Sequence, residues 1–118
     1  MTKNSLGMEF WVDYSHLLKG HPKCGVPHGH TAKVIVEIEG DVSGGSSYKD
    51  NMLIDFHDMK ETCWSVLEKL DHQDLNQIFE YPTAENITQW IFDKLDEKLQ
   101  LSKVTFFEGE GKWCSVAK

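Results

Sequence analysis

Cysteine, proline and long apolar runs are scarce in this sequence. Three Cys and three Pro occur among the 118 residues, and no two cysteines form a CxxC pair. An odd number of widely spaced thiols argues against a disulfide framework. No stretch approaches the roughly 20 apolar residues that a transmembrane helix needs, and the first residues, MTKNSLGMEFW, lack the apolar core of a signal peptide. These absences predict a soluble, cytoplasmic protein that does not contact a membrane.

Positive charge is scarce as well. Twelve Lys and Arg stand against 19 Asp and Glu, which gives a formal net charge of −7. Because nucleic-acid-binding domains need a cationic face for phosphates, this balance argues against nucleic acid as a partner. One segment differs from this acidic charge balance, because LLKGHPKCG contains Lys19 and Lys23 but no acidic residue. Such a basic loop can bind an anionic substrate, although an ordinary solvated loop has the same composition.

The length and composition predict one globular domain over residues 1–118, because the chain is long enough for one core and too short for two. Near the N-terminus, apolar and polar residues alternate in residues 8–16 and again in residues 30–40, as in strands with one buried face. The apolar rows consist of Met8, Phe10, Val12 and Tyr14, followed by His16, and of Ala32, Val34, Val36 and Ile38. A loop rich in Gly and Pro separates the two segments.

Helical spacing follows a polar connection and a short predicted strand over residues 52–56. Residues 57–70 form a first helix and a second begins near Thr83, with an irregular loop between them. The two apolar stripes consist of Met59, Cys63, Val66, Leu67 and Leu70, and of Ile87, Trp90, Ile91, Leu95 and Leu99. Cys63 is therefore expected to be a small core residue, and Cys114, in a strand, likewise.

Residues 103–109 and 112–118 read as two further strands that form a hairpin around Gly109 to Gly111. The order strand, strand, helix, helix, strand, strand predicts an α+β fold, with a four-stranded antiparallel sheet and two helices on one face. Such a sheet has open edges, and pairing of edges between copies into a ring or barrel would cover them.

The loop sequence CGVPHGH, residues 24–30, brings a thiol and two imidazoles together. Alternate residues of an extended chain share a face, so His28 and His30 point the same way. If the first two strands form an antiparallel hairpin, His16 lies beside them. Three His ligands describe a catalytic zinc site with one open position, whereas Cys24 as a fourth ligand would make the site closed and structural.

Other candidates are weaker by residue type alone. Asp71 and His72 stand side by side after the first helix, although a His in a loop is more often a surface residue. Glu108, at the predicted hairpin, has the appearance of a solvated turn acid. His21 and His57 have no context that assigns them a role.

The segments HLLKG, CGVPHGHT, LIDF, LDHQDLN, PTAENI and FFEGE occur in this order across almost the whole chain. In sequence and spacing they resemble the 6-pyruvoyltetrahydropterin synthase family. Three residues separate Cys24 from the HGH segment. This interval is similar to that of the 6-carboxy-5,6,7,8-tetrahydropterin synthases of the queuosine pathway, whereas the biopterin-making synthases have a longer one. The chain departs from the family by a bulky Tyr14 before the first His and by Gly109 after Glu108.

The resemblance implies the tunnelling fold and a homo-oligomer, usually a hexamer, with active sites between subunits. It implies Zn²⁺ as the cofactor and a pterin as the substrate. The implied zinc ligands are His16, His28 and His30, the general base is Cys24, the proton-handling pair is Asp71 with His72, the pterin anchor is Glu108, and Thr83 and Glu85 are further pterin contacts.

The implied reaction converts 7,8-dihydroneopterin triphosphate to 6-carboxy-5,6,7,8-tetrahydropterin, with release of acetaldehyde and triphosphate and without a redox cofactor. Lys19 and Lys23 are then expected to bind the triphosphate. Two alternatives stay open. One is a sister activity on the same scaffold, either formation of 6-pyruvoyltetrahydropterin or cleavage of dihydroneopterin. The other is a non-catalytic module in which Cys24 is the fourth zinc ligand and closes the coordination site.

Overall fold

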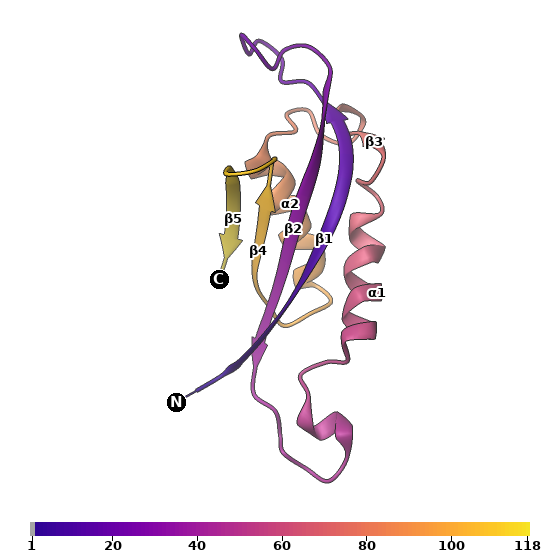
Figure 1. The fold of residues 1–118 in the computed structure, drawn as a ribbon, viewed down its shortest axis with the longest axis vertical. Coiled ribbons are helices and arrows are strands. Elements are labelled where there is room, and N and C mark those ends of the chain that lie inside the picture. The colour runs from indigo at the N-terminus through magenta and orange to yellow at the C-terminus, as the bar shows by residue number, and fades with distance from the viewer. Residues whose placement is uncertain (1) are drawn as a thin grey trace.

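Two long antiparallel strands, β1 (Asn4–His16) and β2 (His28–Gly40), form the centre of the sheet (Figure 1). The structure, a computed structural model, describes residues 2–118. The two strands pair along their whole length, from Asn4 opposite Gly40 to His16 opposite His28. The predicted strands over residues 8–16 and 30–40 are confirmed. Each strand begins before its alternating apolar pattern does, because backbone pairing with the partner strand extends beyond that pattern.

The remaining strands extend this pair on both sides. β4 (Leu101–Phe107) pairs antiparallel with β2, and β5 (Trp113–Ala117) pairs antiparallel with β4. The turn between β4 and β5 requires positive φ at Gly109 and Gly111, which have values of 83° and 77°. The sheet order is β3-β1-β2-β4-β5.

The predicted count of four strands is wrong, because the sheet formed by residues 2–118 has five. β3 (Gln73–Asp74) has only two residues and pairs in parallel with β1 at Tyr14 and Ser15. Two residues are too few to show an alternating pattern, so the sequence around β3 reads as an irregular loop. Beyond this short contact, β1 has no neighbour along its outer edge within residues 2–118.

The helices begin at side-chain caps. Asp55 accepts a hydrogen bond from the His57 backbone N–H and caps α1 (Phe56–Leu67). Thr83 accepts one from the Asn86 backbone N–H and caps α2 (Ala84–Asp96). The predicted strand over residues 52–56 is wrong, because Asp55 caps α1 and Phe56 is the first residue of that helix. Two 3₁₀ turns complete the chain, η1 (Tyr48–Asn51) and η2 (Leu75–Gln77).

Both helices pack against the same face of the sheet, and their apolar stripes meet the even-numbered residues of β1 and β2. The core prediction is confirmed for Cys63, which is fully buried. Cys114 is only half-buried, and all three cysteines are free thiols. The other face of the sheet is uncovered in the single chain, where Trp11 and Trp113 are 60% and 63% exposed. Within residues 2–118, the helices are too short or too polar to cross a bilayer.

Candidate metal centre and active site

Three imidazoles converge at the end of the β1–β2 ladder. His16 pairs with His28, and His30 pairs with Tyr14, which puts all three His side chains on the helix-facing side of the sheet. The ring centroids lie 4.6 Å apart for His16 and His28, 5.0 Å for His16 and His30, and 4.9 Å for His28 and His30. One nitrogen of each ring lies within 4.8 Å of the others. The predicted convergence is confirmed.

Backbone carbonyls fix the orientation of two of these rings. Nδ1 of His16 lies 2.8 Å from the Pro82 carbonyl, and Nδ1 of His28 lies 2.8 Å from the Val26 carbonyl. Because a carbonyl oxygen only accepts, each Nδ1 must donate, and each Nε2 is left with a free lone pair. This is the arrangement by which a metal-binding imidazole is held in the correct tautomer.

Among residues 2–118, the Nε2 atoms of His16 and His30 are buried and find no hydrogen-bond partner. Buried polar atoms are rarely left in this state, so each one needs a physical explanation. Burial also lowers the pKa of His30, which favours its neutral, ligating form, although Glu108 acts in the opposite direction. Three imidazoles whose ligand atoms lie this close together fit a zinc ion.

Cys24 lies in the loop between β1 and β2. The loop is held by a hydrogen bond of 2.7 Å from the Leu18 N–H to the Cys24 carbonyl and by one of 2.9 Å from the Cys24 N–H to Nδ1 of His21. The group of mutually close ligand atoms contains the three His but not the Cys24 thiol. This geometry favours an open three-ligand site over one closed by sulfur.

The same loop carries the two predicted phosphate-binding residues, Lys19 and Lys23, and both are exposed. It projects beyond the end of the sheet (Figure 1). His21, to which the sequence assigned no role, organises it, because its ring also accepts a hydrogen bond from the Lys23 N–H. Gly25 allows the tight closure, since a Cβ there would lie 2.7 Å from the His21 carbonyl oxygen.

Glu108 reaches the histidine cluster from the end of β4. Its Oε1 lies 3.8 Å from Nε2 of His30. Glu85 and Glu108 line one cavity of about 250 Å³ together with Lys112, Trp113 and Cys114. Thr83 differs from these two acids, because its hydroxyl is used to cap α2. The structure thus brings both predicted acids to one cavity next to the histidines.

Tyr14 packs beneath the histidine cluster. Its ring lies 5.2 Å from that of His16, edge-on, and 5.6 Å from that of His30. Burial raises the pKa of its hydroxyl above the ordinary range, and the nearby Glu108 carboxylate adds to this effect. The hydroxyl therefore stays neutral, and the buried Tyr14 ring packs against the imidazoles of His16 and His30.

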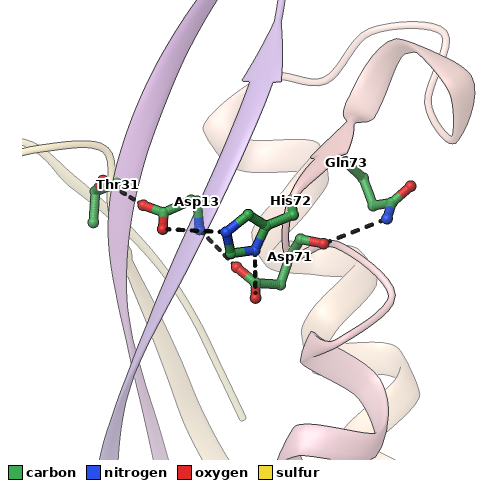
Figure 2. Close-up of polar contacts among 5 residues, drawn as sticks. All are labelled: Asp13, Thr31, Asp71, His72 and Gln73. Atoms are coloured by element: carbon green, nitrogen blue, oxygen red, sulfur yellow. Dashed lines mark hydrogen bonds and ion pairs between the residues drawn. The ribbon is translucent and has the colours of Figure 1, made fainter.

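Asp71 and His72 form an ion pair just after α1, with 2.9 Å between Oδ2 of Asp71 and Nδ1 of His72 (Figure 2). The hydrogen bond with Asp71 raises the pKa of His72. Partial burial acts to raise the pKa of Asp71, but hydrogen bonds from Asp13 and His72 outweigh it and lower that pKa. The predicted pairing of these two residues is confirmed.

This pair is not part of the group of close ligand atoms formed by the three histidines, although His72 and His30 line the same cavity. It contacts Asp13, whose side chain bonds Thr31 on the sheet face opposite Tyr14 and His16, since successive residues of a strand alternate. Asp13 and Thr31 also line a shallow cavity of about 500 Å³ next to His72. Neither Asp13 nor Thr31 was predicted from the sequence. The sequence did indicate that Asp13 and Thr31 lie on the same outer face of two predicted strands.

Several known proteins are similar to this chain in sequence. A protein of Archaeoglobus fulgidus is 40% identical over 114 residues, which cover 96% of this chain and 95% of the relative. The 6-carboxy-5,6,7,8-tetrahydropterin synthase of Haemophilus influenzae is 37% identical over 135 aligned residues, with 92% and 95% covered. The dihydroneopterin monophosphate aldolase of Pyrococcus furiosus is 34% identical over 86 residues, with 70% of each covered.

The fold also matches a solved structure. The Caenorhabditis elegans 6-pyruvoyl tetrahydropterin synthase superposes with a TM-score of 0.87 at 23% identity, covering 100% of this chain and 97% of that one. A family model described as 6-pyruvoyl tetrahydropterin synthase matches residues 5–118. On these grounds, the chain belongs to the 6-pyruvoyl tetrahydropterin synthase family.

Proposed function

We propose that this enzyme is a zinc-dependent lyase that converts 7,8-dihydroneopterin triphosphate and water to 6-carboxy-5,6,7,8-tetrahydropterin, acetaldehyde and triphosphate. The observation that carries the proposal is the group of three converging imidazoles, in which the Nε2 atoms of His16 and His30 are buried without partners. The name of the Haemophilus influenzae relative supports the choice of product. The short interval between Cys24 and His28 agrees with the same choice.

A zinc ion held by His16, His28 and His30 would supply Lewis-acid polarisation of the oxygens on the substrate side chain. The protein provides the rest of the chemistry. The Cys24 thiolate, in the loop that leads into His28, takes the proton from the side-chain carbon next to the pterin ring. The hydrogen bonds from Leu18 to Cys24 and from Cys24 to His21 hold the thiol's backbone in place.

Glu108 binds the pterin ring. A carboxylate accepts two parallel hydrogen bonds from the N–H groups of the aminopyrimidine edge, which gives both affinity and orientation. Its Oε1 lies 3.8 Å from Nε2 of His30, so a pterin bound to Glu108 would lie next to the three histidines. Glu85 lines the same cavity as a second acceptor, and Thr83 keeps that residue in place by capping the helix on which it lies.

Lys19 and Lys23 bind the triphosphate. Both are exposed on a loop without acidic residues, at the same end of the sheet as the three histidines. The overall net charge of −7 would repel a substrate with several negative charges. A local cationic loop offsets this repulsion at the site itself.

Asp71 and His72 return protons to the substrate, and the hydrogen bond between them holds the imidazole in one tautomer. Because Asp13, which contacts this pair, has its side chain on the face of the sheet opposite the three histidines, we propose that the pair serves the cluster of a neighbouring copy. Pairing of the open sheet edges in a homohexamer would bring the two together. We place this assembly in the cytoplasm.

The test is incubation of the purified protein with 7,8-dihydroneopterin triphosphate, followed by identification of the pterin product and of acetaldehyde. A carboxypterin and one equivalent of acetaldehyde are expected. A 6-pyruvoyl product without acetaldehyde would instead assign the sister synthase activity. The Pyrococcus furiosus relative favours a second candidate, an aldolase. That activity would release a 6-hydroxymethyl pterin, which the same analysis detects.

A further inference from the structure

We propose that Asp13 is a positioning residue, which holds the Asp71–His72 pair in its working geometry and provides a second carboxylate for the imidazole (Figure 2). This inference rests on the proposed role of the pair in proton transfer. Asp13 lies on β1, three residues before His16, but its side chain is on the outer face of the sheet. It is therefore not a ligand of the histidine cluster.

The backbone of Asp13 fixes the pair through two hydrogen bonds. The Asp13 N–H donates to Oδ1 of Asp71 at 2.9 Å, and the His72 N–H donates to the Asp13 carbonyl at 2.6 Å. His72 has a φ of 58° and is the only non-glycine residue with positive φ among residues 2–118. Such a conformation is uncommon for a residue with a side chain and persists where surrounding contacts hold it. These two hydrogen bonds connect Asp71 and His72 to β1.

The side chain of Asp13 completes the surroundings of the imidazole. Its Oδ2 lies 4.0 Å from Nε2 of His72, while Oδ2 of Asp71 lies 2.9 Å from Nδ1. The ring therefore has one carboxylate at each nitrogen. Thr31, directly opposite on β2, donates a hydrogen bond to Oδ1 of Asp13 and so fixes the direction in which Oδ2 points.

Both carboxylates favour the imidazolium form of His72. Asp71 makes the larger contribution to the raised pKa, through its hydrogen bond and its charge, and the charge of Asp13 adds to it. Three further titratable residues line the adjoining cavity, namely Asp74, His30 and Tyr14. The Asp74 carboxylate accepts a hydrogen bond from the Asn76 N–H and caps η2. Asp13 is thus the second anion that acts on His72, and Thr31 holds it there.

The experiment compares Asp13→Asn with Glu9→Gln. Asn keeps both backbone hydrogen bonds and the size of the side chain but removes the charge. Glu9 lies on the same face of β1 and pairs with Lys33 at 3.6 Å, away from His72, so Glu9→Gln changes net charge equally. The pKa of His72 is measured by NMR in each variant, together with the pH profile of kcat/KM, the zinc content and the melting temperature.

Asp13→Asn is expected to lower the pKa of His72, by less than Asp71→Asn does, and to move the His72 limb of the pH profile to lower pH. We expect kcat to fall about tenfold, as for partial loss of a general acid–base group, while zinc content stays the same. Glu9→Gln should leave the pKa and the profile unchanged. Thr31→Val, which frees the Asp13 carboxylate, should act in the same direction as Asp13→Asn but more weakly.

An unchanged His72 pKa in Asp13→Asn, or equal shifts in Asp13→Asn and Glu9→Gln, would overturn the proposal. So would lower activity with an unchanged pH profile, because that result indicates only a structural role. If Asp13→Asn does not fold, Thr31→Val decides by the same criteria. The NMR titration needs no turnover, so a wild-type protein that lacks the proposed activity would refute the proposed function and leave the test of Asp13 intact.

Discussion

Zinc bound to the three histidines is predicted to raise the thermal stability of this protein by an amount that follows from binding linkage. In the metal-free protein, the Nε2 atoms of His16 and His30 are buried without partners, and each such group costs about 1–3 kcal/mol. A ligand present at 100 times its Kd stabilises the folded state by about 2.7 kcal/mol. For a chain of this length, about 4 °C of melting temperature corresponds to 1 kcal/mol. Zinc should therefore raise the melting temperature by about 10 °C.

The assay is thermal unfolding by circular dichroism, with EDTA and then with free zinc buffered well above Kd, at one chain concentration. The matched variant is His16→Gln, which keeps a polar side chain at a position that is 2% exposed but removes one ligand. It should bind zinc more weakly and lose most of the increase. His57→Gln, on the exposed surface of α1, should keep the full increase. An equal response of wild type and His16→Gln would refute the assignment of His16 as a ligand.

Four further predictions test the other parts of the site. Cys24→Ala should keep one zinc per chain but lose roughly 10²–10⁴-fold in kcat, as expected for removal of a general base. Lys19→Gln with Lys23→Gln should raise KM for the triphosphorylated substrate more than for its dephospho analogue. Glu108→Gln should weaken pterin binding by about 1.5–3 kcal/mol, as for loss of a charged hydrogen-bond acceptor, which a fluorescence titration measures. The folded-state pKa of Asp71 is lowered, so its stabilising effect is present above the ordinary carboxyl pKa and lost as pH falls through the folded value. The difference in unfolding free energy between wild type and Asp71→Asn should shrink over that acidic range.

Each of these has a clear contrary result. Loss of zinc in Cys24→Ala would indicate a closed, structural site. Equal KM changes for both substrates would remove the phosphate-binding role of the loop. Unchanged pterin affinity in Glu108→Gln would exclude it as the ring anchor. A difference between wild type and Asp71→Asn that is independent of pH would mean that the carboxylate is not stabilised in the folded state.

The sequence predicts the histidine centre well because strand parity is a local property. Alternation from Phe10 to His16 and from His28 onward fixes which side chains share a face. One hairpin then brings His16 and His28 together, as the ladder confirms. No long-range information beyond the pairing of two neighbouring strands was needed.

The rest of the site depends on contacts that sequence spacing does not encode. β3 contains two residues, and its pairing with β1 exists because Asp13 bonds both members of a dipeptide 58 and 59 positions away. The left-handed conformation of His72 is likewise set by these tertiary contacts. The segment over residues 52–56 has an apolar composition that suits a strand, but its acid caps α1 instead. There the capping preference of Asp55, a local signal, outweighed the strand-like composition.

The most direct measurement is X-ray absorption at the zinc edge of the protein loaded with one zinc per chain. We expect three imidazole nitrogens at about 2.0–2.1 Å, no sulfur ligand, and a fourth light atom from solvent that exchanges when substrate binds. A zinc–sulfur distance of about 2.3 Å in the first coordination sphere would contradict it, because Cys24 would then close the position at which the substrate must bind.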